Sequence, residues 1–126
     1  MKNLNFYVCE KCGNIVQMVY DSRVNPVCCG QKMTKLVAGV VDASREKHVP
    51  IVTRDGDVVK VSVGAVTHPM SEEHNIAWIC LHTENGAQLK YLSPDEAPEA
   101  VFALENDKPI AAYAYCNLHG LWKTDI

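Results

Sequence analysis

Six cysteines and five histidines in 126 residues are the side chains of this chain most able to do chemistry. Thiolate and imidazole groups are ligands for iron, zinc and copper. Four of the cysteines lie within the first 29 residues, whereas all five histidines lie at or beyond position 48. This uneven distribution predicts a small thiol-rich metal module at the N-terminal end and a histidine-bearing domain after it.

The N-terminal cysteines form two pairs, each followed by a glycine. Cys9 and Cys12 are separated by two residues, and Cys28 and Cys29 are adjacent. A Cys-x-x-Cys pair can hold one ion from a tight turn, because the following glycine allows a positive φ. Four thiolates around one ion would form a tetrahedral site suited to iron or zinc. The alternative is a Cys28–Cys29 disulfide, which would close a strained ring and leave the first pair without partners.

A second pair, Cys116 and His119, stands near the other end of the chain and is also followed by a glycine. It needs further ligands, and His48, His68 and His74 are expected at strand ends or in loops, where sites are usually built. Four imidazoles and one thiolate exceed the four ligands of a structural zinc site and leave a sixth position open. This set favours iron chemistry on a small oxygen species, and the alternative is that the histidines are ordinary surface residues.

Two chemically active residues are left outside both clusters. Cys80 and His82 fall in one strand-like segment without a nearby partner, and Cys80 is expected to be a packed thiol.

Composition limits the classes of partner. The net charge is −3 and the pI is about 5.9, so no basic stripe is present to bind nucleic acid. No apolar run approaches the roughly 18 residues of a membrane span, and the first residues carry no export signal. We therefore expect a cytoplasmic protein with reduced thiols, no membrane and no nucleic-acid partner.

The elements that must position these side chains are strands. Segments rich in β-branched and aromatic residues recur along the chain: Ile15–Tyr20, Val49–Arg54, Val58–Val66, Ile76–Thr83, Ala87–Leu92, Ala100–Glu105 and Ile110–Tyr115. Asn85-Gly86 is typical of a hairpin turn, and the segment 95–100 contains Pro98 and is expected to be a loop. The pattern predicts an all-β protein, with a metal module over residues 1–37 and an immunoglobulin-like antiparallel sandwich over residues 38–126.

Several motifs resemble a known family. The cysteine pairs over residues 4–36 resemble desulforedoxin, a small iron protein. Three longer motifs, Glu46–Pro50, Gly64–Met70 and Tyr115–Lys123, together with His74, resemble desulfoferrodoxin, the two-iron form of superoxide reductase. They occur in the family's order and the resemblance covers essentially the whole chain.

The resemblance implies two iron centres per chain. The first iron would be held by Cys9, Cys12, Cys28 and Cys29. The second would be held equatorially by four imidazoles, with an axial thiolate: His48, His68, His74, His119 and Cys116. The implied activity is one-electron reduction of superoxide to hydrogen peroxide without release of oxygen. The implied partners are rubredoxin or a similar small electron donor and a second copy of the chain in a homodimer.

Two charged residues beside His48 have implied catalytic roles. Superoxide is an anion and the chain is net negative, so attraction must be local, and Lys47 would supply a positive field and organise a proton-donating water. In the family the residue matching Glu46 closes the sixth position of the ferric resting form. Without the resemblance, both residues are typical of solvated surface charges.

The chain departs from the family's usual pattern at three positions. Asn75 stands where a bulky aromatic residue is common, and Ala77 and Cys80 stand where acidic residues are common. These departures bear on packing beside the site, solvent access and surface charge. Two other functions remain open: an electron carrier with both irons saturated, and a zinc-stabilised binding module.

Overall fold

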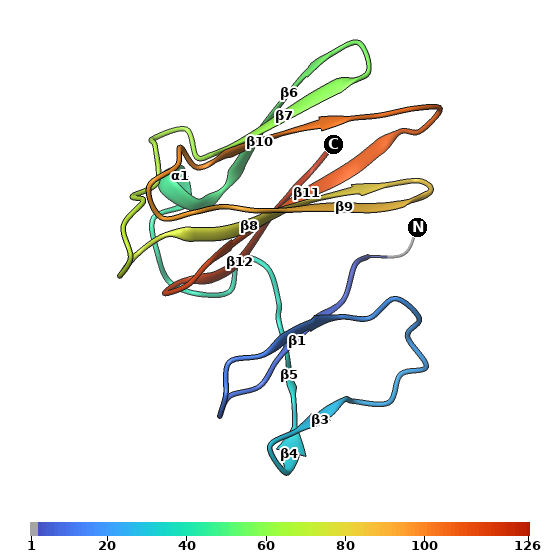
Figure 1. Ribbon diagram of the computed structural model, residues 1–126, viewed down its shortest axis with the longest axis vertical. Coiled ribbons are helices and arrows are strands. Elements are labelled where there is room, and N and C mark those ends of the chain that lie inside the picture. Colours follow the sequence, from blue (N-terminus) through green and yellow to red (C-terminus); the bar gives the residue numbers. More distant parts are fainter. Residues whose placement is uncertain (1–2) are drawn as a thin grey trace. The chain divides into compact units, whose positions relative to one another are not determined.

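The computed structural model describes residues 3–126, and the chain divides into two compact units, Met1–Val37 and Ala38–Ile126 (Figure 1). The structure is almost entirely β, which confirms the predicted fold class. Within the described residues, no helix has the length and apolar character needed to cross a bilayer.

The N-terminal unit is built from very short strands. β1 (Phe6–Val8), β2 (Ile15–Gln17) and β5 (Thr34–Lys35) form an antiparallel sheet in the order β2-β1-β5, and β3 (Val27–Cys28) pairs with β4 (Gln31–Lys32). The expected strand Ile15–Tyr20 ends at Gln17, because Val19 and Tyr20 are 97% and 85% exposed. The other four strands have two or three residues and carry too little periodicity to be predicted.

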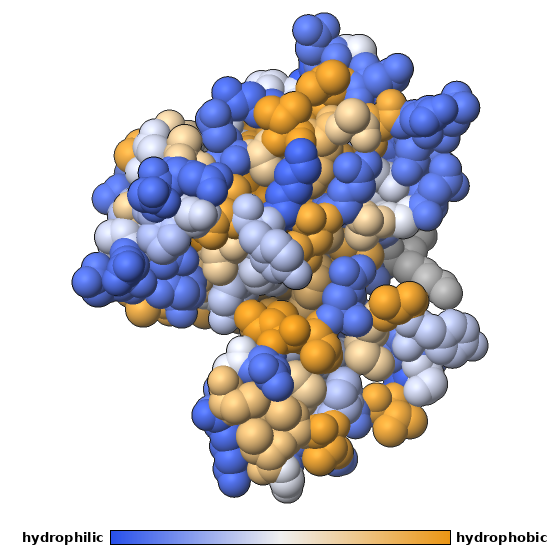
Figure 2. Space-filling view, in the orientation of Figure 1, coloured by the Kyte–Doolittle hydropathy of each residue, from blue (hydrophilic) through white to orange (hydrophobic). Residues whose placement is uncertain are grey.

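The hydrophobic core of this unit is correspondingly small. Its buried members are Tyr7, Cys9 and Met33, with Met18 and Cys28 packed against them. On the face seen in Figure 2, apolar side chains of this unit lie at the surface among polar ones. A core of this size stabilises a fold weakly, and small domains of this kind usually depend on a bound metal.

The second unit is a sandwich of two antiparallel sheets. One sheet has the order β10-β7-β6, from β6 (Pro50–Asp55), β7 (Val58–Val63) and β10 (Glu99–Ala103). The other has the order β12-β11-β8-β9, from β8 (Ile76–Thr83), β9 (Gly86–Tyr91), β11 (Pro109–Cys116) and β12 (Gly120–Asp125). Alternate residues of β7, β8 and β11 fill the core between the sheets, and Cys116 belongs to this core at the end of β11.

Three details differ from the sequence prediction. β12 was not expected, because its residues follow directly on the Cys116–His119 turn and carry only a short apolar run. The helix α1 (Arg45–His48) was not expected either, since four residues show no helical period. The β8–β9 turn uses residues 84 and 85, one position earlier than predicted, because Thr83 pairs with Gly86. The segment 95–98 is a loop as predicted, and β10 begins at Glu99.

The helix α1 is fixed against the segment that follows β7. The Val66 N–H donates to the Glu46 carbonyl at 2.9 Å, and a Cβ placed on Gly64 would lie 2.6 Å from the same oxygen. Any side chain at position 64 would therefore displace the backbone that carries residues 46–48. Glycine here is required by close approach.

Candidate metal centres

The four N-terminal thiols converge on one point. Their Sγ atoms all lie within 4.8 Å of one another, with Cys12–Cys28 at 3.6 Å and Cys28–Cys29 at 3.9 Å. Thiolates about 2.3 Å from a shared ion in a tetrahedron stand about 3.8 Å apart. A disulfide would need about 2.05 Å, so the Cys28–Cys29 alternative is wrong, and all six cysteines are free.

Two turns create this convergence. In the first, the Gly13 N–H donates to the Cys9 carbonyl at 2.9 Å, and the Cys12 N–H points at the Cys9 Sγ at 3.4 Å. In the second, Cys29 has a φ of +52° and Gly30 a φ of +76°. The left-handed backbone at Cys29 turns the chain sharply between two adjacent residues, so both of their sulfurs face the same point.

Three of the four thiols have shifted pKa values, and the shifts differ in direction. The hydrogen bond from the Cys12 N–H lowers the pKa of Cys9 to about 6. Hydrogen bonds with Cys12 raise the pKa of Cys28 and raise that of Cys29 to about 12. Cys9 therefore ionises more readily than Cys28 and Cys29, and binding of an ion must displace the protons of those two thiols, which makes uptake pH-dependent.

In the second unit, four imidazoles form a square. Neighbouring ring centroids are 4.6–5.1 Å apart in the cyclic order His48, His68, His74, His119, and neighbouring planes are close to perpendicular. The opposite pair His48–His74 is 6.3 Å apart. The His48 Nε2 lies 3.2 Å from the His68 Nε2 and 3.1 Å from the His119 Nδ1. Nitrogens placed about 2.1 Å from a common centre in a square stand about 3.0 Å apart, so these distances fit equatorial ligation of one ion.

Backbone carbonyls orient two of these rings. The His48 Nδ1 lies 2.6 Å from the Ser44 carbonyl, and the His68 Nδ1 lies 2.7 Å from the Pro69 carbonyl. A proton on each Nδ1 leaves the Nε2 lone pair directed into the cluster. The His74 Nε2 is buried and has no hydrogen-bond partner among the described residues, as expected of a nitrogen that binds an ion.

A thiol supplies the fifth donor. Cys116 is fully buried, its Sγ groups with the nitrogens of His48, His68 and His74 within 4.8 Å, and it lies 3.8 Å from the His119 Nδ1. Burial raises the pKa of Cys116. Four nitrogens and one sulfur are one ligand more than structural zinc uses, and they fit a six-coordinate iron with one position open.

Three of the histidines have lowered pKa values, which favours the neutral form that binds metals. Burial lowers the pKa of His48 and His74, and it lowers that of His68 to about 4. Nearby imidazoles lower these values further. At neutral pH these three rings therefore present lone pairs, not protons, to an ion.

Two asparagines join the loop of His74 to the turn of Cys116. The Asn75 N–H donates to the Asn117 Oδ1 at 2.9 Å, and the Asn117 N–H donates to the Asn75 carbonyl at 3.2 Å. The Asn75 amide also donates to the carbonyls of Ser71 and Glu72 at 2.8 and 3.2 Å. Sequence reasoning missed both as positioning residues, although each directly follows a proposed ligand.

Glu46 and Lys47 are exposed on α1, next to His48. The positive charge of Lys47 contributes, after burial and the neighbouring imidazoles, to the lowered pKa of His48 and His74. The electric field of the Lys47 ammonium therefore reaches the imidazole cluster.

Cys80 and His82 lie outside both clusters. Cys80 is fully buried, and burial raises its pKa to about 12, as expected of a packed thiol. With no exposed surface, Cys80 makes no contribution to the surface charge. His82 is also buried, and burial lowers its pKa.

Trp122 is a further residue that sequence reasoning did not single out. Its ring stacks on His48 with centroids 5.0 Å apart and planes 28° apart, and its Nε1 donates to the His119 carbonyl at 3.1 Å. Its sequence signals were its place three residues after His119 and its membership of the Tyr115–Lys123 motif.

A tetrathiolate module followed by a β-sandwich with four imidazoles and one thiolate defines a protein with two non-haem iron centres. Family models agree with this class: residues 40–125 match desulfoferrodoxin, and residues 1–36 match the desulfoferrodoxin N-terminal domain. The chain belongs to the desulfoferrodoxin family, which confirms the resemblance drawn from the sequence.

Individual relatives extend over most or all of the chain. A desulfoferrodoxin of Syntrophotalea carbinolica is 44% identical over 124 residues, which are 98% of both chains. A superoxide reductase of Thermococcus kodakarensis is 39% identical and covers 68% of this chain and 90% of its own length. The crystal structure of the superoxide reductase from Treponema pallidum has a TM-score of 0.84 and 42% identity, over 98% of this chain and all of that one.

Proposed function

We propose that this protein is a superoxide reductase that converts superoxide to hydrogen peroxide at the iron centre of its second unit. The observation that carries the proposal is the square of four imidazole rings with the Cys116 sulfur beside it. Five donors on a six-coordinate ion leave one position for a small ligand. A carrier with saturated irons would need a sixth protein donor, and among the described residues no sixth histidine or cysteine joins this cluster.

The reaction consumes one electron and two protons for each superoxide and yields one hydrogen peroxide. A ferrous ion would be held by these five side chains and would supply the electron. The first role of the chain's own residues is to orient the ligand rings. The carbonyls of Ser44 and Pro69 fix the rings of His48 and His68. The Cys116 thiolate donates electron density to the ion from a fully buried position that excludes water.

In this proposal, Glu46 and Lys47 act where superoxide approaches the iron centre. The exposed ammonium of Lys47 attracts the superoxide anion in a chain whose net charge is −3. It also orders a water that delivers protons to the departing product. The carboxylate of Glu46 is a hard oxygen donor that would favour the ferric over the ferrous ion, so it would protect the site after turnover.

We also propose the roles of the two units and their partners. Residues 1–37 form the tetrathiolate iron module on Cys9, Cys12, Cys28 and Cys29, and residues 38–126 form the reductase domain with His48, His68, His74, His119 and Cys116 as ligands. The electron donor is rubredoxin or a similar small carrier, and the protein acts as a homodimer. The compartment is the cytoplasm, where thiols stay reduced.

Stopped-flow oxidation of the pre-reduced, iron-loaded protein by superoxide tests the activity. We expect a rapid second-order reaction, one peroxide per superoxide and no oxygen. A dismutase would release oxygen and form half as much peroxide, and a pure electron carrier would form no peroxide at this rate. Iron and zinc determinations on the same sample distinguish any of these iron proteins from a zinc-stabilised binding module.

A further inference from the structure

The indole of Trp122 lies directly against the sandwich iron site. Its ring stacks on the face of His48, with centroids 5.0 Å apart and planes 28° apart. The His48 Nε2 stays directed at the other imidazoles, 3.1 Å from the His119 Nδ1 and 3.2 Å from the His68 Nε2. Trp122 therefore contacts a ligand side chain without taking any position at the ion. None of the roles proposed above accounts for this contact.

The indole is fixed in this place by its surroundings. Trp122 is 2% exposed, and its Nε1 donates to the carbonyl of His119 at 3.1 Å. On the neighbouring strand β11 its partner is Ala114, whose small side chain leaves room on the same face of the sheet. A buried aromatic face attracts a positive group more strongly than an exposed one, because less water competes for that group.

This contact has an electrostatic consequence for a bound ion. An imidazole that binds an ion through its Nε2 takes up part of the positive charge of that ion. The face of an indole is negative, so the Trp122 ring attracts the charge carried by His48. The attraction is stronger for a ferric than for a ferrous ion, because the ferric ion has the larger charge. The stacked indole therefore favours the ferric state.

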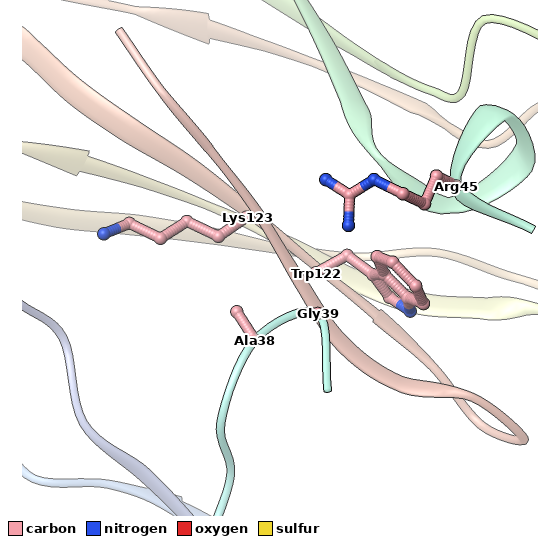
Figure 3. A pocket seen from close by; sticks show the side chains of 5 residues that line it. All are labelled: Ala38, Gly39, Arg45, Trp122 and Lys123. Atoms are coloured by element: carbon pink, nitrogen blue, oxygen red, sulfur yellow. The ribbon is translucent and has the colours of Figure 1, made fainter. Parts of the chain in front are cut away.

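A guanidinium group acts on the same indole. Arg45 and Trp122 line a cavity of about 240 Å³, and the Arg45 Cζ lies 6.0 Å from the centre of the Trp122 ring (Figure 3). Lys123 also lines the cavity, but Figure 3 shows its side chain extending away from both, and its Nζ lies 3.0 Å from a carboxylate oxygen of Asp125. Arg45 is therefore the lining cation beside the indole. A positive charge here favours the ferrous state, so Arg45 opposes Trp122.

We propose that Trp122 is a positioning residue that lowers the reduction potential of the sandwich iron by holding a negative ring face against His48. Arg45 limits this effect from the cavity. The inference rests on the ligand set of the proposed function and on its one-electron cycle. A lower potential makes the ferrous ion a stronger reductant of superoxide, and it makes the return to the ferrous state less favourable. The two residues therefore balance the two halves of the cycle.

A redox titration of the second iron, followed by its visible absorption, tests the role of Trp122. Trp122→Leu removes the ring face and is expected to raise the midpoint potential. The ratio of the affinities for ferric and ferrous ion should fall about threefold to tenfold, and tenfold corresponds to about 59 mV for one electron. Trp122→Phe keeps an aromatic face without the Nε1 donor and is expected to restore at least about half of the shift.

Trp78→Leu is the matched control for this substitution. Trp78 is also buried, but its ring stacks on Tyr115, with centroids 5.5 Å apart and planes 6° apart, and not on an imidazole. The affinity ratio in this variant is expected to stay within about twofold of that of the unmodified protein. A potential that is unchanged or lower in Trp122→Leu, or raised equally in Trp78→Leu, would overturn the proposal. An equal shift in Trp122→Leu and Trp122→Phe would assign the effect to the bond with His119 and would also overturn it.

Arg45→Gln gives a test that leaves the core unchanged, and it decides the matter if Trp122→Leu binds no iron. Arg45 is exposed, and its removal is expected to lower the potential, with a change of about twofold to threefold in the affinity ratio at low salt and less at high salt. Arg54→Gln removes the same charge from the far end of β6 and is expected to leave the potential unchanged. An unchanged or raised potential in Arg45→Gln contradicts the proposal. Superoxide takes no part in these titrations, so a failure of the proposed activity is distinguished from a failure of this inference.

Discussion

Protonation of the histidines decides whether the sandwich can hold an ion. The buried environment of His68 lowers its pKa from 6.5 to about 4, and the same cause acts on His48 and His74. A chain that unfolds releases these imidazoles into water, where they bind protons more readily. Metal-site formation and acid stability are therefore linked at the level of single residues.

The metal-free protein is expected to lose stability on acidification. Between about pH 6.5 and pH 4 the unfolded state binds more protons at His68 than the folded one, so this residue lowers the free energy of unfolding by at most about 1.4 kcal/mol per pH unit. His48 and His74 act in the same direction. Above pH 6.5 the contribution is fully present, and below about pH 4 that of His68 stops changing. Urea unfolding followed by tryptophan fluorescence measures the slope. His68→Asn should show a shallower slope, and an unchanged slope would contradict the pKa assigned to this residue.

Substitution of Lys47 tests directly whether a local positive charge attracts the substrate. Lys47→Ala is expected to slow the reaction of the reduced protein with superoxide about threefold to tenfold at low salt and to weaken its dependence on ionic strength. The spectrum of the ferrous site should stay the same. Lys108→Ala is a matched control, because position 108 precedes β11 and Cys116 ends it, roughly 25 Å away along the strand. Equal rates in the two variants would remove the steering role.

At the level of elements, the iron site is assembled from three short segments held against each other. The helix α1 carries His48, the loop after β7 carries His68 and His74, and the end of β11 with the turn that follows it carries Cys116 and His119. Gly64 fixes the first segment by close approach, and Asn75 joins the other two through Asn117. Backbone contacts between segments therefore set the positions of the donors.

Asn75→Ala removes the two hydrogen bonds that hold the His74 loop, each worth about 1 kcal/mol. We expect the second iron to bind about tenfold more weakly, as measured by competition with a chelator, because the two lost bonds fix the shape of the loop that carries His74. Asn85→Ala provides the control, since it removes a side-chain hydrogen bond from the β8–β9 turn instead. Equal iron affinity in the two variants would show that Asn75 does not position the site.

On the scale of the whole molecule, two units carry chemically different sites. The N-terminal unit has a core of a few side chains and a tetrathiolate cluster, whereas the sandwich has a continuous core of twelve buried residues. The small unit is therefore expected to depend on its metal for folding, while the sandwich is stabilised by its own packing.

Cys12→Ser is expected to abolish the first iron and leave the reaction of the second with superoxide unchanged. Iron per chain should fall from two to one, and the rate of oxidation by superoxide measures the second centre. Cys80→Ser serves as a comparison, because it changes a buried thiol outside both clusters. Loss of superoxide reduction in Cys12→Ser with an intact second centre would make the first iron essential.

The sequence by itself determined the all-β class and the thiol pairs of the first site, because both are written in local patterns, whereas the five donors of the second site were assigned through the resemblance to a family. Alternating apolar residues predict strands, and cysteine pairs with two residues or none between them lie in turns that bring sulfurs together. Only the tertiary structure decided which nitrogen of each imidazole faces the cluster, that Cys80 is fully buried, and that Trp122 stacks on His48. The physical reason is sequence distance: His48 and His119 are separated by 71 residues, and the packing of two sheets, which no local pattern encodes, brings their nitrogens to 3.1 Å.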